Sequence, residues 1–180
     1  MKTKSFLAIV AAVLFSISAG AQNYETGDMN TNLDISLISS FTGETELPPT
    51  TVSFEIGVAE NIALGVFGGI STSTESNAFS NGKSYRWEHD NIFYGLRGMY
   101  YFYSNTGIDL YGGASAGNNS VTSEFFTDDD LREKDNPTDA GGFIYRAFAG
   151  GRYYFSEPFG IYAEAGLGII NLNLGVTAKF

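Results

Sequence analysis

The sequence of 180 residues contains no cysteine and little positive charge, with 10 Lys and Arg against 20 Asp and Glu. Without cysteine, the chain can form neither disulfides nor thiolate metal sites, and it offers no cysteine for lipid attachment. The formal net charge of -10 argues against nucleic-acid binding, because that function needs a basic face. A hydrophobic content of 43% and an aromatic content of 15% argue against a disordered protein.

Long apolar runs are also missing, apart from one near the N-terminus. Lys2 and Lys4 precede an apolar run over residues 6–17, and Ala19-Gly20-Ala21 then fits a small-x-small cleavage site. The run is shorter than the ~20 residues of a spanning helix, which makes an anchoring helix the weaker alternative. We predict a cleaved signal peptide over residues 1–21, and the loss of both lysines changes the formal charge from -10 to -12.

What the chain does contain is glycine, tyrosine and phenylalanine, at 22, 11 and 15 residues, a mixture that favours strands and tight turns. Apolar and polar residues alternate with the period of half-exposed strands. The segments with this pattern are residues 32–38, 51–58, 62–70, 91–103, 108–116, 143–155, 160–168 and 171–180. We predict an all-β fold: an antiparallel up-and-down β-barrel of about eight strands over residues 32–180, after a short periplasmic segment, 22–31.

The connections between these segments alternate in length. Short connections rich in turn-forming residues lie at 59–61, 104–107 and 156–159. Long polar stretches, which carry most of the surplus acid, lie at 39–50, 71–85 and 118–141. Short turns at one end and long loops at the other are typical of outer-membrane barrels, in which the turns are periplasmic. The last connection, near residues 169–170, is almost absent.

Alternation alone does not decide which face points outward, because a soluble eight-stranded barrel also alternates, with its apolar row inside. Aromatic residues gather beside the short turns, as at a membrane interface. They are Tyr100 to Tyr103, Tyr153 to Phe155, Phe159, Tyr162 and Phe180. The polar row is unusually rich in glycine and serine, which suits a narrow lumen that also holds a few large residues, here Tyr111, Phe148 and Tyr162. We therefore expect a monomeric transmembrane barrel surrounded by lipid in the outer membrane of a Gram-negative bacterium.

The last ten residues, NLNLGVTAKF, form an amphipathic strand that ends in an aromatic residue. Asn173, Gly175, Ala178 and Phe180 match the pattern polar–x–Gly–x–x–hydrophobic–x–aromatic, although Ala178 is smaller than the residue usually found there. On this motif and the eight-strand pattern, residues 32–180 resemble the small outer-membrane barrels of the OmpA/OmpX type. The resemblance implies a structural role in the cell envelope. It also implies that these four residues are the signal read by the barrel-assembly machinery.

The polar row carries charges within the predicted strands, four of each sign. They are Asp34, Glu55, Asp109 and Glu164 against Arg97, Arg146, Arg152 and Lys179. Buried charges are tolerated when they are paired, and eight strands enclose a lumen that side chains can fill. We predict a polar plug, with Arg152 near Glu164 and Lys179 near Asp34. The alternative is a gate, in which rearranged ion pairs open a narrow channel.

The single histidine, His89, lies between Glu88 and Asp90. Some eight-stranded outer-membrane barrels modify lipid A with a Ser/His/acid site, so this residue is a candidate catalytic base. Neighbours in a strand point to opposite faces, however, so neither acid is placed to orient the ring. We expect a non-enzymatic protein with no cofactor, and a lipid-modifying enzyme remains a remote alternative.

The acidic run TDDDLREKD over residues 127–135 could offer oxygen ligands to calcium, but it lacks the spacing of an EF-hand loop. We expect a hydrated loop and no metal site. The same region is a candidate for binding an unknown extracellular partner, which makes an adhesion barrel the leading functional alternative. Its candidate contact residues are Phe125, Phe126, Asp128, Asp129 and Asp130.

Overall fold

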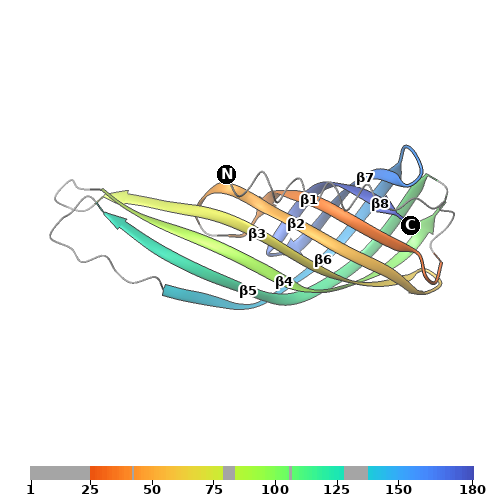
Figure 1. The fold of residues 1–180 in the computed structure, drawn as a ribbon, viewed down its shortest axis with the longest axis horizontal. Helices are drawn as coiled ribbons and strands as arrows, with labels where there is room; N and C mark the ends of the chain where they lie inside the picture. The colour runs from red at the N-terminus through yellow and green to blue at the C-terminus, as the bar shows by residue number, and fades with distance from the viewer. Residues whose placement is uncertain (1–24, 42, 79–83, 106, 128–137) are drawn as a thin grey trace.

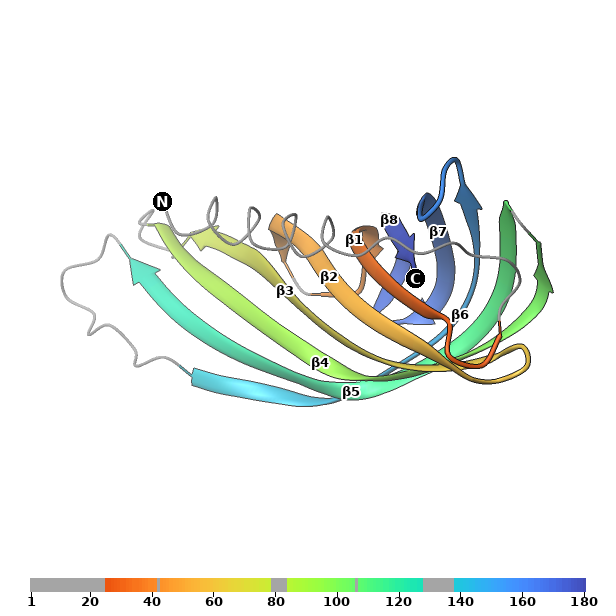
Figure 2. The same cartoon turned by 45° about the vertical axis from the view of Figure 1, so that its right-hand side comes forward.

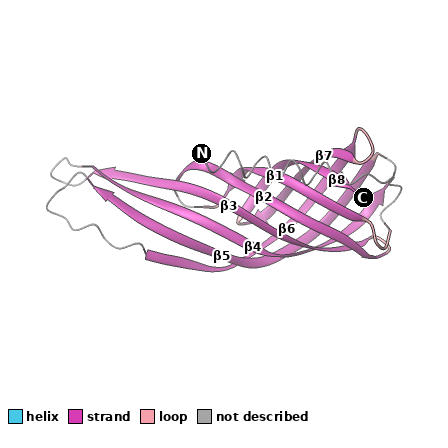
Figure 3. Ribbon diagram, viewed as in Figure 1, coloured by secondary structure: helices cyan, strands magenta, loops and turns pink. Residues whose placement is uncertain are grey.

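Eight antiparallel strands close into one barrel, in which each strand pairs with its neighbours in sequence and β8 pairs with β1 (Figure 1). The computed structural model describes residues 25–41, 43–78, 84–105, 107–127 and 138–180. The strands are β1 (Met29–Ser39), β2 (Glu44–Ala59), β3 (Ile62–Ala78), β4 (Ser84–Ser104), β5 (Ile108–Thr127), β6 (Thr138–Tyr154), β7 (Phe159–Gly168) and β8 (Ile170–Lys179). The predicted all-β, eight-stranded up-and-down barrel is confirmed, and strands make up nearly all of the described chain in Figure 3.

None of the described residues belongs to a helix that is long and apolar enough to cross a membrane.

The seam between β1 and β8 closes the barrel. Asn30 lies opposite Lys179, and the pairing continues to the last residue. The Phe180 N–H donates to the Met29 carbonyl at 2.8 Å, and the Met29 N–H donates to the Phe180 carbonyl at 2.9 Å. Because β1 begins at Met29, before the strand predicted from residue 32, part of the segment predicted as a separate N-terminal stretch joins the barrel wall.

The short connections lie where the sequence predicts them. Glu60 and Asn61 join β2 to β3, and Asn61 has a φ of 61°, a left-handed conformation that asparagine tolerates in tight turns. At the opposite end, Ile169 alone joins β7 to β8, after Gly168 with a φ of 132°. That positive φ favours glycine, which allows this connection to be so short.

The three stretches interpreted as long loops are mostly strand, so this prediction is wrong. Thr and aromatic residues favour strands, and cross-strand backbone hydrogen bonds do not need an apolar side chain on either face. Strands β3, β4 and β5 therefore continue past the ends of β7 and β8, as Figures 1 and 2 show. We call this extension the projecting wall; it comprises residues 72–78 of β3, 84–91 of β4 and 118–127 of β5.

Strand length separates the barrel from the projecting wall. A tilted strand needs ~9–11 residues to cross a membrane. Strands β7 and β8 have 10 residues each, whereas β4 has 21 and β5 has 20. The longer strands therefore have about twice the length that a crossing needs, and the barrel rim is high on the β3–β5 side and low on the β7–β8 side.

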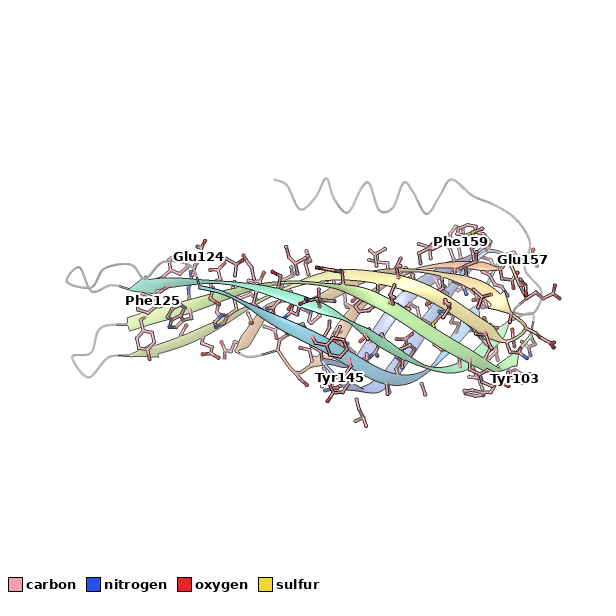
Figure 4. All side chains as sticks on the ribbon, turned by 90° about the horizontal axis from the view of Figure 1, so that it is seen from below. Tyr103, Glu124, Phe125, Tyr145, Glu157 and Phe159 are labelled. Carbon is pink, nitrogen blue, oxygen red and sulfur yellow. The ribbon has the colours of Figure 1, made fainter. Side chains whose placement is uncertain are left out.

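The apolar row faces outward, as the sequence predicts. Leu167, Phe143 and Leu96 are 79%, 74% and 67% exposed, whereas the charged residues of the opposite row are buried. Tyr145 points away from the barrel in Figure 4. On the projecting wall the outward positions become polar. Along β4, in the direction of the high rim, the exposed apolar belt ends at Asp90. The exterior thus has an apolar belt around the barrel and a polar surface beyond it.

Aromatic side chains ring the short-turn end, although fewer than the sequence suggests. Tyr103 and Phe159 lie at this end in Figure 4, far from Phe125. Tyr100, Phe102, Tyr103, Tyr153 and Phe155 are exposed there. Tyr101, which was predicted to join this ring, is buried in the lumen instead, and so is Tyr162, which was predicted both for this ring and for the lumen. They occupy the inward phase of their strands, which outweighs their position beside the turns.

Candidate functional site

The middle of the lumen holds a network of buried ion pairs centred on Glu164 of β7. Its Oε1 accepts hydrogen bonds from Arg97 Nη2 at 2.5 Å and from the Tyr111 hydroxyl at 3.0 Å. Its Oε2 accepts a hydrogen bond from Arg146 Nη1 at 2.6 Å. One carboxylate on β7 therefore joins side chains from β4, β5 and β6.

Glu55 of β2 extends the network across the lumen. Its Oε2 accepts a hydrogen bond from Arg152 Nη2 at 2.6 Å, and its Oε1 lies 3.3 Å from Arg97 Nε. Asn32 Nδ2 also donates to Glu55 Oε1, at 2.9 Å. Arg97 thus contacts both glutamates, and the side chains of both glutamates are fully buried.

Aromatic rings complete the surroundings of the three arginines. The Phe148 ring lies between the guanidinium groups of Arg97 and Arg146, at 4.8 and 4.9 Å from its centroid. The Arg152 guanidinium lies 4.5 Å from the centroid of Tyr111. Rings placed in this way attract a desolvated cation through their quadrupole. The network therefore combines ion pairs, hydrogen bonds and cation–π contacts.

An apolar layer lies between this network and the high rim. Phe93, Ile144 and Ile170 are buried together, and Phe41, Phe67 and Ile169 pack against them. The cavity between the layer and the network measures about 30 Å³, which is roughly the volume of one water molecule. The lumen thus holds a charged layer at its middle and an apolar layer nearer the high rim.

Sequence reasoning missed this apolar layer. Phe93 and Ile144 lie within the unbroken apolar stretches IFY and FIY, where the alternation cannot be read. Their neighbours on both sides face outward, which turns these two residues into the lumen. A usable signal was present, because three consecutive apolar residues of a strand cannot all face the same side.

Both predicted ion pairs differ in the structure, where Arg152 and Lys179 have other acidic partners. Arg152 lies opposite Tyr162, and Glu164 lies opposite Gly150, so the register separates the pair by two residues. Arg152 instead reaches across the lumen to Glu55. The long arginine side chain can span a narrow lumen, and local register alone does not reveal such a contact.

Lys179 and Asp34 are likewise held apart. Asp34 lies opposite Gly175, four residues from Lys179, and the Lys179 ammonium lies 3.0 Å from Asp28 Oδ2. Asp34 accepts hydrogen bonds from the Tyr162 hydroxyl at 2.5 Å and from Asn173 Nδ2 at 2.7 Å.

Asp109 also contacts neutral groups. It accepts hydrogen bonds from Ser104 Oγ at 2.5 Å and from the Tyr154 hydroxyl at 3.0 Å. Of the eight charged residues, the structure joins five in one network. The other three, Asp34, Asp109 and Lys179, have other contacts.

The C-terminal motif is built into β8 and its seam. Asn173 faces the lumen, and Gly175 lies opposite both Asp34 of β1 and Tyr162 of β7. Ala178 is buried between β1 and β7, where it lies opposite Thr31 and Phe159. A small residue at this position therefore has a packing reason.

Comparison with solved structures places this geometry among known barrels. The N-terminal β-barrel domain of Pseudomonas aeruginosa OprF matches with a TM-score of 0.55 and 14% identity, over 89% of this chain and 100% of that one. The fold is that of the small OmpA-type outer-membrane barrels.

Two structures of Ail, the attachment invasion locus protein of Yersinia pestis, match with TM-scores of 0.44 and 12% identity. They cover 86% of this chain and 97% or 99% of theirs, and one holds the heparin analogue sucrose octasulfate. No model of a protein family and no curated protein matches the sequence.

The residues predicted to form a partner-binding loop lie partly in a strand of this barrel. Phe125 belongs to β5 and packs against Trp87 on the inner face of the projecting wall, with ring centroids 4.9 Å apart. Phe126 lies under the Arg86 guanidinium, which is 5.2 Å from the ring centroid. Asp128, Asp129 and Asp130 lie outside the described residues, as does most of the acidic run considered for calcium. Within the described part of the chain, no cluster of His, Asp and Glu has the form of a metal site.

His89 lies in β4 on the inner face of the projecting wall. Its Nδ1 is 2.8 Å from Ser123 Oγ, a contact between directly opposed residues of β4 and β5. Asp90 is on the opposite face, where its carboxylate accepts a hydrogen bond from Thr72 Oγ1 at 2.7 Å. Among the described residues, no carboxylate hydrogen-bonds to the His89 ring, so the arrangement lacks the acid that orients a catalytic histidine.

Proposed function

We propose that the protein is an integral outer-membrane barrel with a structural role in a Gram-negative envelope, and that it has no catalytic activity. The observation that carries the proposal is the inverted distribution of side chains. Leu167 and Phe143 are largely exposed on the outside, whereas Glu55 and Arg152 are fully buried inside. In water this arrangement would expose a broad apolar belt, which soluble monomers rarely do. In lipid it is favourable, and closure leaves no strand edge unpaired.

Replacing Leu96 with arginine tests the lipid-facing belt. Leu96 points outward near the middle of β4, so a charge there should destabilise the membrane-embedded barrel by about 2–4 kcal/mol. Thr122→Arg is the matched control, because Thr122 points outward from the projecting wall, beyond the belt. Stability is measured by urea titration in lipid vesicles, with the folded fraction read from the different gel mobilities of unboiled and boiled samples. Equal stability of the two variants, or a parent protein that stays soluble without detergent, would exclude a membrane barrel.

The two layers of side chains inside the lumen support a structural role over that of a pore. We infer that the charged network and the apolar layer together close the path between the two ends of the barrel. We expect purified protein in planar lipid bilayers to show no sustained porin-sized current. The positive control is a large trimeric porin in the same bilayer. Sustained large currents from this protein would show that the side chains move aside, and would favour the gated channel.

Export and assembly complete the proposal. Residues 1–21 act as a cleaved signal peptide, and the barrel-assembly machinery reads Asn173, Gly175, Ala178 and Phe180. The barrel acts as a monomer, since closure satisfies its own strand edges. The pairing of β8 with β1 supports this reading, because the four residues lie in or directly after the strand that closes the barrel.

Partner binding at the cell surface is a second candidate, favoured by the projecting wall. Its strands carry aromatic and polar side chains well beyond the membrane belt. Rigid strands position such side chains better than loops do. For this second function, the surface that binds the partner is the inner face of the projecting wall, in place of the acidic loop that the sequence suggested.

A further inference from the structure

A cavity of about 390 Å³ lies above the apolar layer, between the projecting wall and the low rim. Its lining includes Ser73, His89 and Asn119 from the wall, and Phe41 and Ile169 from the connections at the rim. The volume falls near the lower end of the ~300–1,000 Å³ range of small-molecule sites. We call it the vestibule. It is separate from the ion-pair network, and it takes no part in the structural role proposed above.

Two buried polar atoms of the vestibule have no hydrogen-bond partner among the described residues. Ser73 is 0% exposed and its Oγ is unpartnered; Asn119 is 8% exposed and its Oδ1 is unpartnered. The Asn119 amide is held in place by its Nδ2, which donates to Asn91 Oδ1 at 2.9 Å. Leaving buried polar groups unpaired costs free energy, so most native examples have a partner. A ligand that offers hydroxyl groups can donate to both oxygens.

The remaining polar groups of the vestibule are already oriented. The contact of 2.8 Å between His89 Nδ1 and Ser123 Oγ fixes the imidazole ring, and Asn91 Nδ2 donates to the His89 carbonyl at 3.4 Å. These three side chains stand on the paired strands β4 and β5. Groups that are fixed before binding lose little entropy when a ligand arrives, which favours affinity.

Aromatic rings lie at the floor of the vestibule and beside His89 of its lining. Phe41 packs on Phe93 with ring centroids 5.7 Å apart, and the two form the floor with the apolar layer. Trp87 stacks on His89 with centroids 6.4 Å apart and an interplanar angle of 3°, and Phe125 contacts Trp87. A ligand with one apolar face and a rim of hydroxyls matches this combination of flat rings and hydrogen-bonding groups.

Charge narrows the class of ligand. Among the described residues that line the vestibule, Glu75 alone carries a full charge, and no lysine or arginine is present. A sulfated or phosphorylated ligand would find no cation to pair with and would meet a carboxylate. A neutral hydroxylated ligand avoids that repulsion, and Glu75 can accept hydrogen bonds from two adjacent hydroxyls.

We propose that the vestibule binds a neutral sugar ring, held by Ser73 and Asn119 and packed against the aromatic rings. The sugar can belong to a glycan outside the cell or to the lipopolysaccharide of the same membrane, because both present the same chemistry. Binding requires the folded barrel but does not depend on its lumen or on its role in the envelope.

Trp87 is the only tryptophan of the chain, so its fluorescence reports on the edge of the vestibule. Full-length folded protein in an amine-oxide detergent is titrated with neutral hexoses and oligosaccharides, since glycoside detergents would compete. Saturation-transfer NMR on the same samples detects the bound sugar directly. Vesicles with and without lipopolysaccharide form a second arm, and a response to them identifies the membrane as the source of the sugar.

Asn119→Ala and Asn118→Ala form a matched pair, because Asn118 is exposed on the outer face of the same strand. We expect saturable binding that Asn119→Ala weakens about tenfold or more, equivalent to ~1.4 kcal/mol, while Asn118→Ala leaves it unchanged. Gel mobility of unboiled samples confirms that each variant is folded. Absence of saturable binding in either arm, equal loss in both variants, or binding of sulfated sugars alone would each overturn the proposal.

Discussion

Replacing Glu164 with glutamine should destabilise the barrel by about 3–5 kcal/mol, the usual cost of removing one partner of a buried ion pair. Glutamine has nearly the same shape, but it leaves Arg146 without its carboxylate partner and leaves Arg97 with Glu55 alone. Both guanidinium groups are almost fully buried, so water cannot replace the lost charge. The loss therefore comes from uncompensated desolvation more than from the strength of the original bonds.

The midpoint of urea unfolding in vesicles, followed by gel mobility, measures this loss. Glu124→Gln is the matched control, since Glu124 is exposed on the outer face of β5, and surface changes of this kind stay within about 0.5 kcal/mol. A second variant, Glu164→Gln with Arg146→Met, separates the two sources of the loss. Removing the unpaired cation should recover part of the stability. Together with the two single variants, the double variant completes a double-mutant cycle, which gives the coupling free energy between Glu164 and Arg146. If Glu164→Gln and Glu124→Gln unfold at the same urea concentration, the network does not stabilise the barrel.

The barrel itself was predictable from the sequence because its two faces differ in chemistry. In β2, Phe54 and Ile56 face outward, whereas Glu55 between them faces the lumen. An alternation of this kind identifies the strand and sorts its residues into two faces, since a shift by one residue would exchange them. The aromatic residues beside the short turns and the small residues of the polar row then indicated that the polar face is the inner one. The number of strands and the short turns then follow from the repeated pattern and from the residues that form turns.

The contacts across the lumen could not be predicted in the same way. Arg152 and Glu55 are 97 residues apart and come from strands that are not neighbours in the sheet. Their meeting depends on the stagger of the closed barrel and on the reach of two long side chains, neither of which is written in local spacing. The projecting wall was hidden for another reason. Its outward face is polar, so its sequence has the composition of a loop even though its backbone continues the sheet.

Replacing Gly175 with valine should produce the other large loss of barrel stability. This variant also separates the packing role of the C-terminal motif from its role as an assembly signal. A Cβ atom on Gly175 would lie 2.4 Å from the Leu33 carbonyl oxygen and 2.6 Å from Cε1 of Tyr162. The carbonyl belongs to the paired backbone of β1, so it cannot move unless the seam opens. We expect a loss of about 3 kcal/mol, at the upper end for overpacking. Gly142→Val is the matched control, since nothing lies within 4 Å of a Cβ atom built there.

Refolding from urea into detergent, without any cellular factor, distinguishes this steric effect from an assembly signal. Gly175→Val should lower the folded yield both in cells and in detergent, because the clash is part of the barrel itself. Deleting Phe180 removes one residue at the end of the seam, with two backbone hydrogen bonds to Met29. That deletion should lower the folded yield in cells while refolding in detergent stays close to that of the parent. Should the Phe180 deletion fail equally in both settings, the terminal aromatic residue acts through stability, and the recognition role would rest on Asn173, Gly175 and Ala178.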